Sequence, residues 1–194
     1  MQYGEEIKRS APILMTCDRI KEVSGFHCGD KNIDAYLKEE ACYDSSAVTY
    51  IVKEGTDEDE TEKDETPKEI IYFYSLSCSG LVVDNSSGYL PGKAKIEIIP
   101  SIEIKMFALN EQYHGMPYNK SDGWNFSDAL FMDVINHIDK IKKEICGARK
   151  IILYSVPRAE SFYERNGFSK YSDNYIKNSD LHIAGCVPMY MDWD

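Results

Sequence analysis

The feature that most constrains the fold is an amphipathic helix followed at once by a short buried strand. Ser127 is the predicted N-cap of this helix, and the apolar residues after it form one stripe: Phe131, Val134, Ile135, Ile138, Ile141 and Ile145. Gly147 is the predicted end of the helix. Residues 150–154 read Lys-Ile-Ile-Leu-Tyr, which is typical of a buried strand. The pattern predicts an α/β domain.

The remainder of the chain alternates between strand and helix patterns. An amphipathic helix with an acid near its start is predicted from Asp30, and a short helix opens at Pro157 and ends at Gly167. Strand patterns occur at residues 11–17, 47–53, 69–83, 102–109 and 182–191. The second and third of these strands are predicted to pair as a hairpin across a long loop.

The loop of that hairpin, residues 54–69, is strongly acidic. It holds nine acids and two lysines, a net charge of −7 out of −11 for the whole chain, which leaves −4 for the rest. A run of like charge is typical of a solvated loop. The 194 residues suffice to bury a core, and we expect a single domain over residues 1–194 that carries this loop.

The composition argues against several classes of protein. The chain has no apolar run of about 18 residues that could cross a bilayer, and its N-terminal residues lack the apolar segment of a signal peptide, so we expect a cytoplasmic protein. The six cysteines include no Cys-x-x-Cys pair and the four histidines are scattered, which predicts reduced thiols and no metal site. The acidic balance disfavours a nucleic-acid partner, because phosphate contacts need a lysine and arginine surplus.

Three stretches together resemble the GNAT superfamily of acyl-CoA-dependent N-acyltransferases. The first is Phe26-His27-Cys28-Gly29, which is similar to the opening of the subgroup that includes tRNA-acetylating toxins. The second is the strand at residues 102–109, which runs into Tyr113-His114-Gly115. The third and most specific is residues 159–168, Ala-Glu-Ser-Phe-Tyr-Glu-Arg-Asn-Gly-Phe. The resemblance covers nearly the whole chain and implies a mixed, mostly antiparallel central sheet flanked by helices.

The resemblance also implies a site for acetyl-CoA as co-substrate. The main chain of Phe107, Ala108 and Leu109 would hold the pantetheine arm and the thioester, in a notch beside the strand at residues 150–154. A backbone N–H there can stabilise the tetrahedral oxyanion of acyl transfer. Tyr163 stands where the family commonly keeps a tyrosine that protonates the departing thiolate, although an aromatic residue at that position can also simply pack in the core.

The cofactor's pyrophosphate would rest on the loop that begins at His114 and Gly115 and on the helix N-terminus near Ser127. Here the sequence departs from the family. Pro117 stands at a glycine position of the phosphate loop and has no N–H to donate. Asp128 adds a negative charge in the first turn of the helix, where a phosphate would be repelled.

Three functions remain open from the sequence. The leading one is an acetyl-CoA-dependent N-acetyltransferase that acts on a primary amine of a small molecule, peptide or protein. The second is a toxin that acetylates aminoacyl-tRNA, which the Phe-His-Cys-Gly opening favours and the acidic charge disfavours. The third is a catalytically silent, partner-binding domain, which Pro117 favours. Glu97 and Glu103 are candidate general bases, or solvated strand residues.

Overall fold

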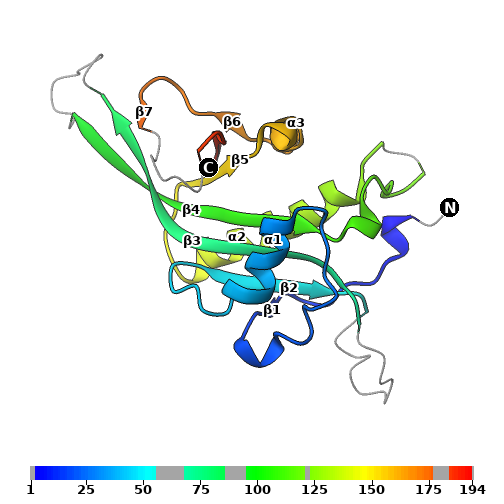
Figure 1. The fold of residues 1–194 in the computed structure, drawn as a ribbon. Helices are drawn as coiled ribbons and strands as arrows, with labels where there is room; N and C mark the ends of the chain where they lie inside the picture. Colours follow the sequence, from blue (N-terminus) through cyan, green and yellow to red (C-terminus); the bar gives the residue numbers. More distant parts are fainter. Residues whose placement is uncertain (1–2, 56–67, 86–94, 121–122, 177–183, 194) are drawn as a thin grey trace. The chain divides into compact units, whose positions relative to one another are not determined.

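The protein forms a mixed α/β structure around one eight-stranded sheet. The computed structural model describes residues 3–55, 68–85, 95–120, 123–176 and 184–193, so most of the predicted acidic loop lies outside the described residues. The strand order is β1-β2-β3-β4-β5-β8-β6, with β7 paired to β3. Strands β4 and β5 run in parallel, whereas the pairs β1–β2, β2–β3, β3–β7, β5–β8 and β6–β8 are antiparallel. The expected mostly antiparallel sheet flanked by helices is confirmed (Figure 1).

The bounds of the elements are as follows. The strands are β1 (Ile13–Leu14), β2 (Val48–Lys53), β3 (Ile70–Asp84), β4 (Ile96–Leu109), β5 (Lys150–Ser155), β6 (Ser169–Lys170), β7 (Tyr175–Ile176) and β8 (Val187–Asp192). The α-helices are α1 (Lys31–Ala35), α2 (Phe126–Glu144) and α3 (Glu160–Arg165). Single turns of 3-10 helix occur at Gly4–Glu6, Cys17–Arg19, Glu111–Tyr113 and Pro157–Ala159, and a π-helical turn, Tyr36–Glu40, follows α1.

Most predicted elements are present, with shifted bounds. The pairing of β2 with β3 confirms the predicted hairpin. The first strand shrinks to two residues, and β4 begins at Ile96 instead of residue 102, even though Pro100 within it has no N–H for a ladder hydrogen bond. The last strand begins at Val187, and part of its predicted range lies outside the described residues. Within the described residues, no helix is long and apolar enough to span a membrane.

The chain divides into two compact units. The first comprises Met1–Leu76 and Met106–Ile135, and the second comprises Ser77–Lys105 and Asn136–Asp194. Strands β3 and β4 and helix α2 each contribute residues to both units, so the units share elements although each has its own core.

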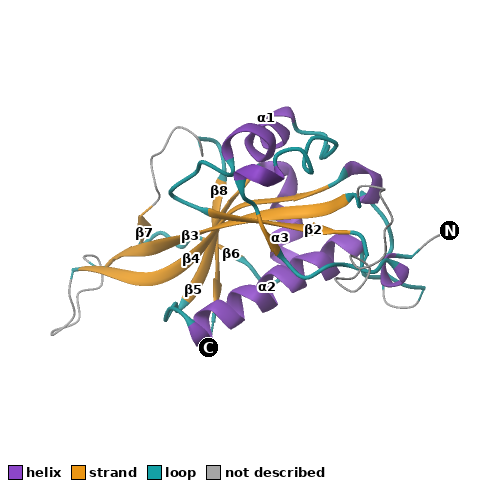
Figure 2. Cartoon of the chain, turned by 90° about the horizontal axis from the view of Figure 1, so that it is seen from below, coloured by secondary structure: helices purple, strands orange, loops and turns teal. Residues whose placement is uncertain are grey.

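The first unit has an apolar core on each face of its strands. Alternate residues of a strand point to opposite faces. Phe73 of β3 lies in the cluster that also holds Leu37, which follows α1, and Ala108 of β4. Its neighbour Tyr72 points the other way, and its ring contacts Phe107, which in turn contacts Phe131 of α2. Helices α1 and α2 accordingly cover opposite faces of these strands (Figure 2).

Both helices of the first unit begin with an acid that accepts backbone hydrogen bonds. Asp30 caps α1, since its side chain accepts from the N–H groups of Asn32 and Ile33, as the sequence predicts. The predicted N-cap of α2 is wrong. The helix begins at Phe126, and Ser127 lies inside its first turn. The physical reason is the acid that follows, because the Asp128 carboxylate accepts from the N–H of Asn125 and fixes the start there.

The second unit is built on the parallel pair β4–β5. Four residue pairs connect the two strands, from Ser101 with Lys150 to Ile104 with Leu153. Strand β8 pairs with the other edge of β5 along its whole length. The chain between β5 and β6 forms α3, and Gly167, at φ +91°, ends it as predicted. A small core of Leu81, Val83, Ile99 and Ile152 is flanked by the rings of three tyrosines.

Candidate functional site

Tyr163 lies in the middle of helix α3, in the second unit. Its ring packs against Phe162, at 5.1 Å between centroids, and against Phe168, at 6.0 Å. Its carbonyl accepts hydrogen bonds from the N–H groups of Asn166 and Phe168, which close the end of the helix. The residues of the most specific motif therefore build one compact turn around the tyrosine, and they hold its ring by packing.

The environment of Tyr163 keeps its hydroxyl protonated. Burial raises the pKa of Tyr163 above its ordinary value. A protonated hydroxyl is what a proton donor to a thiolate needs. The same shift makes the donation less favourable than from an exposed tyrosine, because a thiol has an ordinary pKa of about 8.5. Tyr163 is thus suited to give a proton at neutral pH and unsuited to accept one.

The side chains at the C-terminal end of β4 pack against other parts of the first unit. Phe107 packs between Tyr72 and Phe131. Ala108 and Leu109 are buried, at 6% and 8% exposure. Since all three side chains are committed to the core, any contact that they make with a ligand would come from backbone groups. The role that the resemblance implies for these residues, main-chain contacts with the pantetheine arm and the thioester, stays a prediction.

The turn after β4 holds His114 and Gly115. Nε2 of His114 lies 3.0 Å from the carbonyl oxygen of Leu109, and the backbone N–H of His114 donates to Glu111. Gly115 has φ +69°, a left-handed conformation that favours glycine, and open space surrounds its Cα. The structure thus brings His114, Gly115 and Leu109 together at one end of β4.

The segment after Gly115 folds back on itself before helix α2. Pro117 and Asn125 form an isolated antiparallel bridge, and the N–H of Tyr118 donates to Trp124. The N-terminal segment covers this turn, because the N–H groups of Gly4 and Glu5 donate to the carbonyls of Pro117 and Tyr118. The segment that the resemblance assigns to the phosphate loop is thus a backbone turn that is hydrogen-bonded to the N-terminal segment.

The start of α2 is closed in the same way. The N–H of Phe126 donates to the carbonyl of Met116, and the N–H groups of Asp128 and Ala129 donate to Asn125. The Asp128 carboxylate, at 6% exposure, lies in the first turn of the helix and accepts from the N–H of Asn125. Ser127 is half-buried between these groups. This helix start satisfies most of its N–H groups within the chain.

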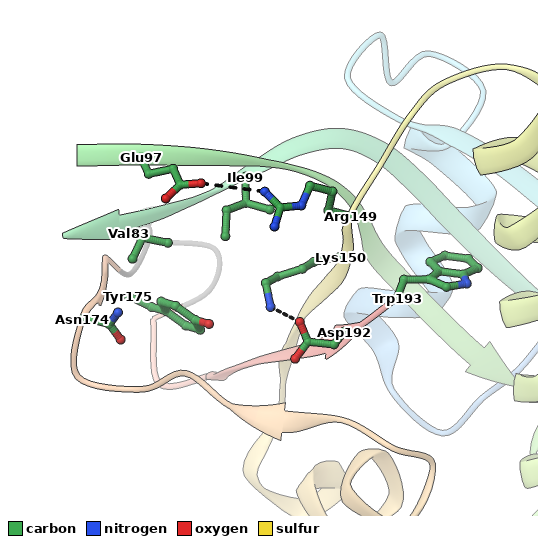
Figure 3. Close-up of a pocket in the computed structure, with 9 residues that line it drawn as sticks. All are labelled: Val83, Glu97, Ile99, Arg149, Lys150, Asn174, Tyr175, Asp192 and Trp193. Carbon is green, nitrogen blue, oxygen red and sulfur yellow. Dashed lines mark hydrogen bonds and ion pairs between the residues drawn. The ribbon is translucent and has the colours of Figure 1, made fainter. Parts of the chain in front are cut away.

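A polar pocket of about 240 Å³ lies in the second unit (Figure 3). Its charged groups are paired with one another, Arg149 with Glu97 at 3.8 Å and the buried Lys150 with Asp192. The ammonium group of Lys150 also lies 4.4 Å from the ring centre of Tyr190. Lys150 is the first residue of β5 and α3 follows its last residue, so the pocket and Tyr163 mark opposite ends of that strand.

The two carboxylates that the sequence suggests as general bases, Glu97 and Glu103, both lie on β4 in the second unit. Glu97, a candidate general base, is an exposed partner of Arg149 in the pocket. Glu103 lies on the same face of β4 and contributes to raising the pKa of Tyr171, after the larger effect of burial. Neither arrangement selects one of these carboxylates as the base.

A polar cluster that the sequence motifs do not indicate lies at the loop before α1. Nδ1 of His27 contacts Oδ2 of Asp34, whose side chain is 8% exposed. The two residues are seven positions apart, and only the path of the loop brings them together. One sequence pattern could have indicated the pair. Asp34 lies in the first turn of a helix, and the loop before that helix carries His27. Among the described residues, no group of His, Cys, Asp and Glu side chains is arranged to hold a metal ion.

Comparisons with known proteins give a consistent picture of the fold. No protein-family model matches the chain, and no curated protein sequence matches it. Among solved structures, a protein described as a bacterial toxin has a TM-score of 0.63 at 20% identity, over 94% of this chain and 89% of that one. AtaTR bound with acetyl-CoA has a TM-score of 0.64 at 15% identity, over 95% and 94%. AtaT complexed with acetyl-methionyl-tRNAfMet has a TM-score of 0.60 at 15% identity, over 94% of each chain.

These matches extend over nearly the whole of both chains, at low sequence identity. They show that the chain has the GNAT-like fold of the AtaT and KacT toxins, and they confirm at the level of the fold the resemblance that the three motifs indicate.

Proposed function

We propose that this chain is an acetyl-CoA-dependent N-acetyltransferase whose acceptor is the amino group of an aminoacyl-tRNA. The observation that carries the proposal is the near-complete match of the fold to toxins solved with acetyl-CoA and with acetyl-methionyl-tRNAfMet. The Phe26-His27-Cys28-Gly29 opening, read from the sequence, favours the same acceptor over a small molecule or a protein amine.

The chemistry of the proposed reaction suits the residues that the fold supplies. The amine attacks the thioester carbonyl, the C–S bond breaks, and CoA leaves as a thiolate. Backbone N–H groups of β4 near Phe107, Ala108 and Leu109 would stabilise the oxyanion. The hydroxyl of Tyr163 would protonate the thiolate, for which it is kept in the protonated form.

The acidic surface shapes how a tRNA would be held. With a net charge of −11, the protein can make few contacts with phosphates. We propose that recognition is concentrated at the aminoacylated end of the tRNA. Such an acceptor would place the protein in the cytoplasm.

The proposal is tested by acetyl transfer to charged tRNA. Purified protein is incubated with labelled acetyl-CoA and methionyl-tRNA, and the label bound to tRNA is measured before and after mild alkaline hydrolysis of the ester. We expect label that is released as the N-acetyl amino acid. Deacylated tRNA and tRNA charged with N-formylmethionine are the controls and should remain unlabelled. Equal labelling of the deacylated tRNA, or no labelling with any aminoacyl-tRNA, would contradict the proposed acceptor.

A second candidate function is a catalytically silent domain that binds a protein partner. Two features favour it: the hydrogen-bonded N–H groups at the start of α2 and the turn at Pro117. Both would leave fewer backbone N–H groups to bind the CoA pyrophosphate. Titration with acetyl-CoA separates the two candidates, since a silent domain would show no heat of binding at millimolar ligand.

A further inference from the structure

The loop before α1 holds an exposed histidine against a buried carboxylate. The side chain of His27 is 55% exposed, whereas that of Asp34 is 8% exposed, and Nδ1 of His27 contacts Oδ2 of Asp34. Within the described part of the chain, the other ring nitrogen of His27 has no hydrogen-bond partner. An ionised carboxylate only accepts hydrogen bonds, so the ring nitrogen that faces it carries the proton and Nε2 presents its lone pair to solvent.

Asp34 is fixed as an ionised acceptor. Burial raises its pKa, but hydrogen bonds from the backbone N–H and thiol of Cys28 and from the ring of His27 outweigh burial and leave the pKa below its ordinary value. The bond from the Cys28 N–H measures 2.9 Å. That bond goes to Oδ1 of Asp34 and the His27 ring contacts Oδ2, so both oxygens of the carboxylate are engaged. The histidine therefore has a rigid orienting group.

The adjacent cysteine is not the reactive group of this cluster. Burial, followed by its hydrogen bond to Asp34, raises the pKa of the Cys28 thiol to about 12. The thiol also donates to the carbonyl of Asp30, at 3.7 Å. It is therefore a protonated donor that supports the carboxylate, and not a reactive thiolate. The functional atom that remains is Nε2 of His27.

The histidine stands beside the C-terminal end of β4. Phe26 and Cys28, its two chain neighbours, pack in the same apolar cluster as Met106 and Ala108. The carbonyl of His27 accepts a hydrogen bond of 2.8 Å from the N–H of Glu111, two residues beyond the end of the strand. The loop is thus tied, by packing and by a backbone hydrogen bond, to the strand that the proposed function assigns to the thioester.

We propose that His27, oriented by Asp34, is the residue that accepts the proton of the attacking amine in acetyl transfer. The inference rests on the proposed function. His27 is the catalytic residue of this pair and Asp34 is its positioning residue.

The step balances as follows. The neutral amine attacks the carbonyl carbon of the thioester and forms the C–N bond. The nitrogen then loses one proton to Nε2 of His27, and the C–S bond breaks as the electron pair returns to the carbonyl. The CoA thiolate takes a proton from Tyr163 or from water, and the imidazolium returns its proton to solvent. Imidazole suits this role because it exchanges protons readily near neutral pH.

Acidic side chains lie near His27 on two neighbouring elements. Asp34 faces the ring from α1, and Asp30 lies at the start of the same helix. Glu111 approaches from the turn after β4, where its carboxylate oxygen lies 3.8 Å from the position that a side chain on Gly29 would occupy. The Asp34 carboxylate would stabilise the imidazolium that forms when the ring takes up the proton of the amine.

Three variants test the role of the pair. His27→Gln keeps a polar side chain but cannot take up a proton, and we expect kcat for methionyl-tRNA acetylation to fall by roughly 10²–10⁴-fold with unchanged acetyl-CoA affinity. Asp34→Asn donates to Nδ1 and moves the ring proton to Nε2, so it should lower kcat as well. Glu39→Gln is the matched control, because it removes one negative charge from the exposed surface of the π-helical turn that follows α1, outside the His27–Asp34 pair. It should retain full kcat.

Two readouts separate catalysis from structure. Added imidazole should restore activity to His27→Ala and leave the activity of Glu39→Gln unchanged. Long-range 1H–15N spectra of the histidine rings, with the His27 signal identified by its loss in His27→Gln, should show the proton on Nδ1 in the wild-type protein and on Nε2 in Asp34→Asn. The spectra require no activity.

The outcomes distinguish a failure of the proposed function from a failure of the role of His27. If the wild-type protein binds no acetyl-CoA or transfers no acetyl group, the proposed function fails and takes this role with it. If the wild-type protein is active and His27→Gln retains its kcat, the proposed function stands and the role of His27 is wrong. A wild-type ring with its proton on Nε2 would also overturn the assignment.

Discussion

The starts of α1 and α2 share one feature, an acid that accepts a backbone hydrogen bond, but the surroundings of the two acids differ. Each helix begins beside an acid that accepts a backbone hydrogen bond, Asp34 from Cys28 at α1 and Asp128 from Asn125 at α2. At α1 the second oxygen of the acid turns to an exposed histidine. At α2 the acid is buried, and the surrounding backbone groups are paired with the Pro117 turn. The start of α1 thus carries an exposed imidazole, whereas most N–H groups at the start of α2 are hydrogen-bonded within the chain.

The difference indicates where the chemistry of this protein is built. A helix N-terminus attracts anions through unpaired N–H groups and its dipole. The start of α2 has lost much of both attractions, since most of its N–H groups have acceptors within the chain and the Asp128 carboxylate opposes the positive end of the dipole. We infer that the main chain of β4, Tyr163 and His27 carry the function, and that the usual phosphate seat contributes little.

The largest effect is expected for Tyr163→Phe. The change removes only the hydroxyl, so kcat should fall by roughly 10²–10⁴-fold while acetyl-CoA affinity and the melting temperature stay nearly constant. Tyr171→Phe is the control, because Tyr171 is another tyrosine of the second unit whose pKa burial raises. Near-full activity in Tyr163→Phe would make that residue a core aromatic. Loss of affinity together with kcat would make it a cofactor-positioning residue.

Gly4→Ala should lower the unfolding free energy, although it adds only one methyl group. A Cβ at Gly4 would lie 2.3 Å from a ring carbon of the fully buried Phe126, so the N-terminal segment could not stay seated on the start of α2. Overpacking of this kind costs about 1–3 kcal/mol of unfolding free energy. Gly25→Ala is the control, since no atom lies within 4 Å of its Cβ position. Equal urea midpoints for the two variants would show that the segment does not cover the helix start.

Asp128→Asn should partly reopen the closed helix start. The amide can still accept from Asn125, so the change removes mainly a negative charge, and affinity for acetyl-CoA should rise about two- to fivefold. Asp139→Asn, farther along the same helix and paired with Lys143, is the control and should leave affinity unchanged. Calorimetric titration measures both. A fall in affinity with Asp128→Asn would mean that the carboxylate serves the cofactor.

The smallest effect concerns stability in acid. The folded-state pKa of Asp34 is lowered, so its contribution is complete above the unfolded value of about 3.9 and is lost as pH falls through the folded value. Urea midpoints of the wild-type protein should therefore drop more steeply below about pH 4 than those of Asp34→Asn. Parallel curves for the two proteins would show that Asp34 is not held as an ionised acceptor.

The fold was accessible to sequence reasoning because the apolar pattern is strong. Phe131, Val134 and Ile138 of the predicted stripe are fully buried on α2. The stripe fails only at Ile145, which is 78% exposed just beyond the last residue of the helix. Burial repeats along an element, so its signal survives without knowledge of the neighbours.

The site was harder to predict because its contacts depend on loop paths. Pro117 and Asp128 mark the altered phosphate loop in the sequence, but the bridge from Pro117 to Asn125 and the cover by Gly4 do not. The contact between His27 and Asp34 likewise spans a loop and a helix start. A propensity or a period describes one element at a time, and these contacts join two.

The most direct measurement compares the binding of acetyl-CoA and of S-acetylpantetheine, which lacks the nucleotide and its phosphates, to the wild-type protein by calorimetry. If β4 holds the thioester arm and the start of α2 is closed, both ligands should bind, with dissociation constants within about tenfold of each other, which is about 1.4 kcal/mol. A loss of a hundredfold or more for S-acetylpantetheine would contradict the account, because it would show a working phosphate seat. No binding of either ligand would refute the acetyl-CoA-dependent function itself.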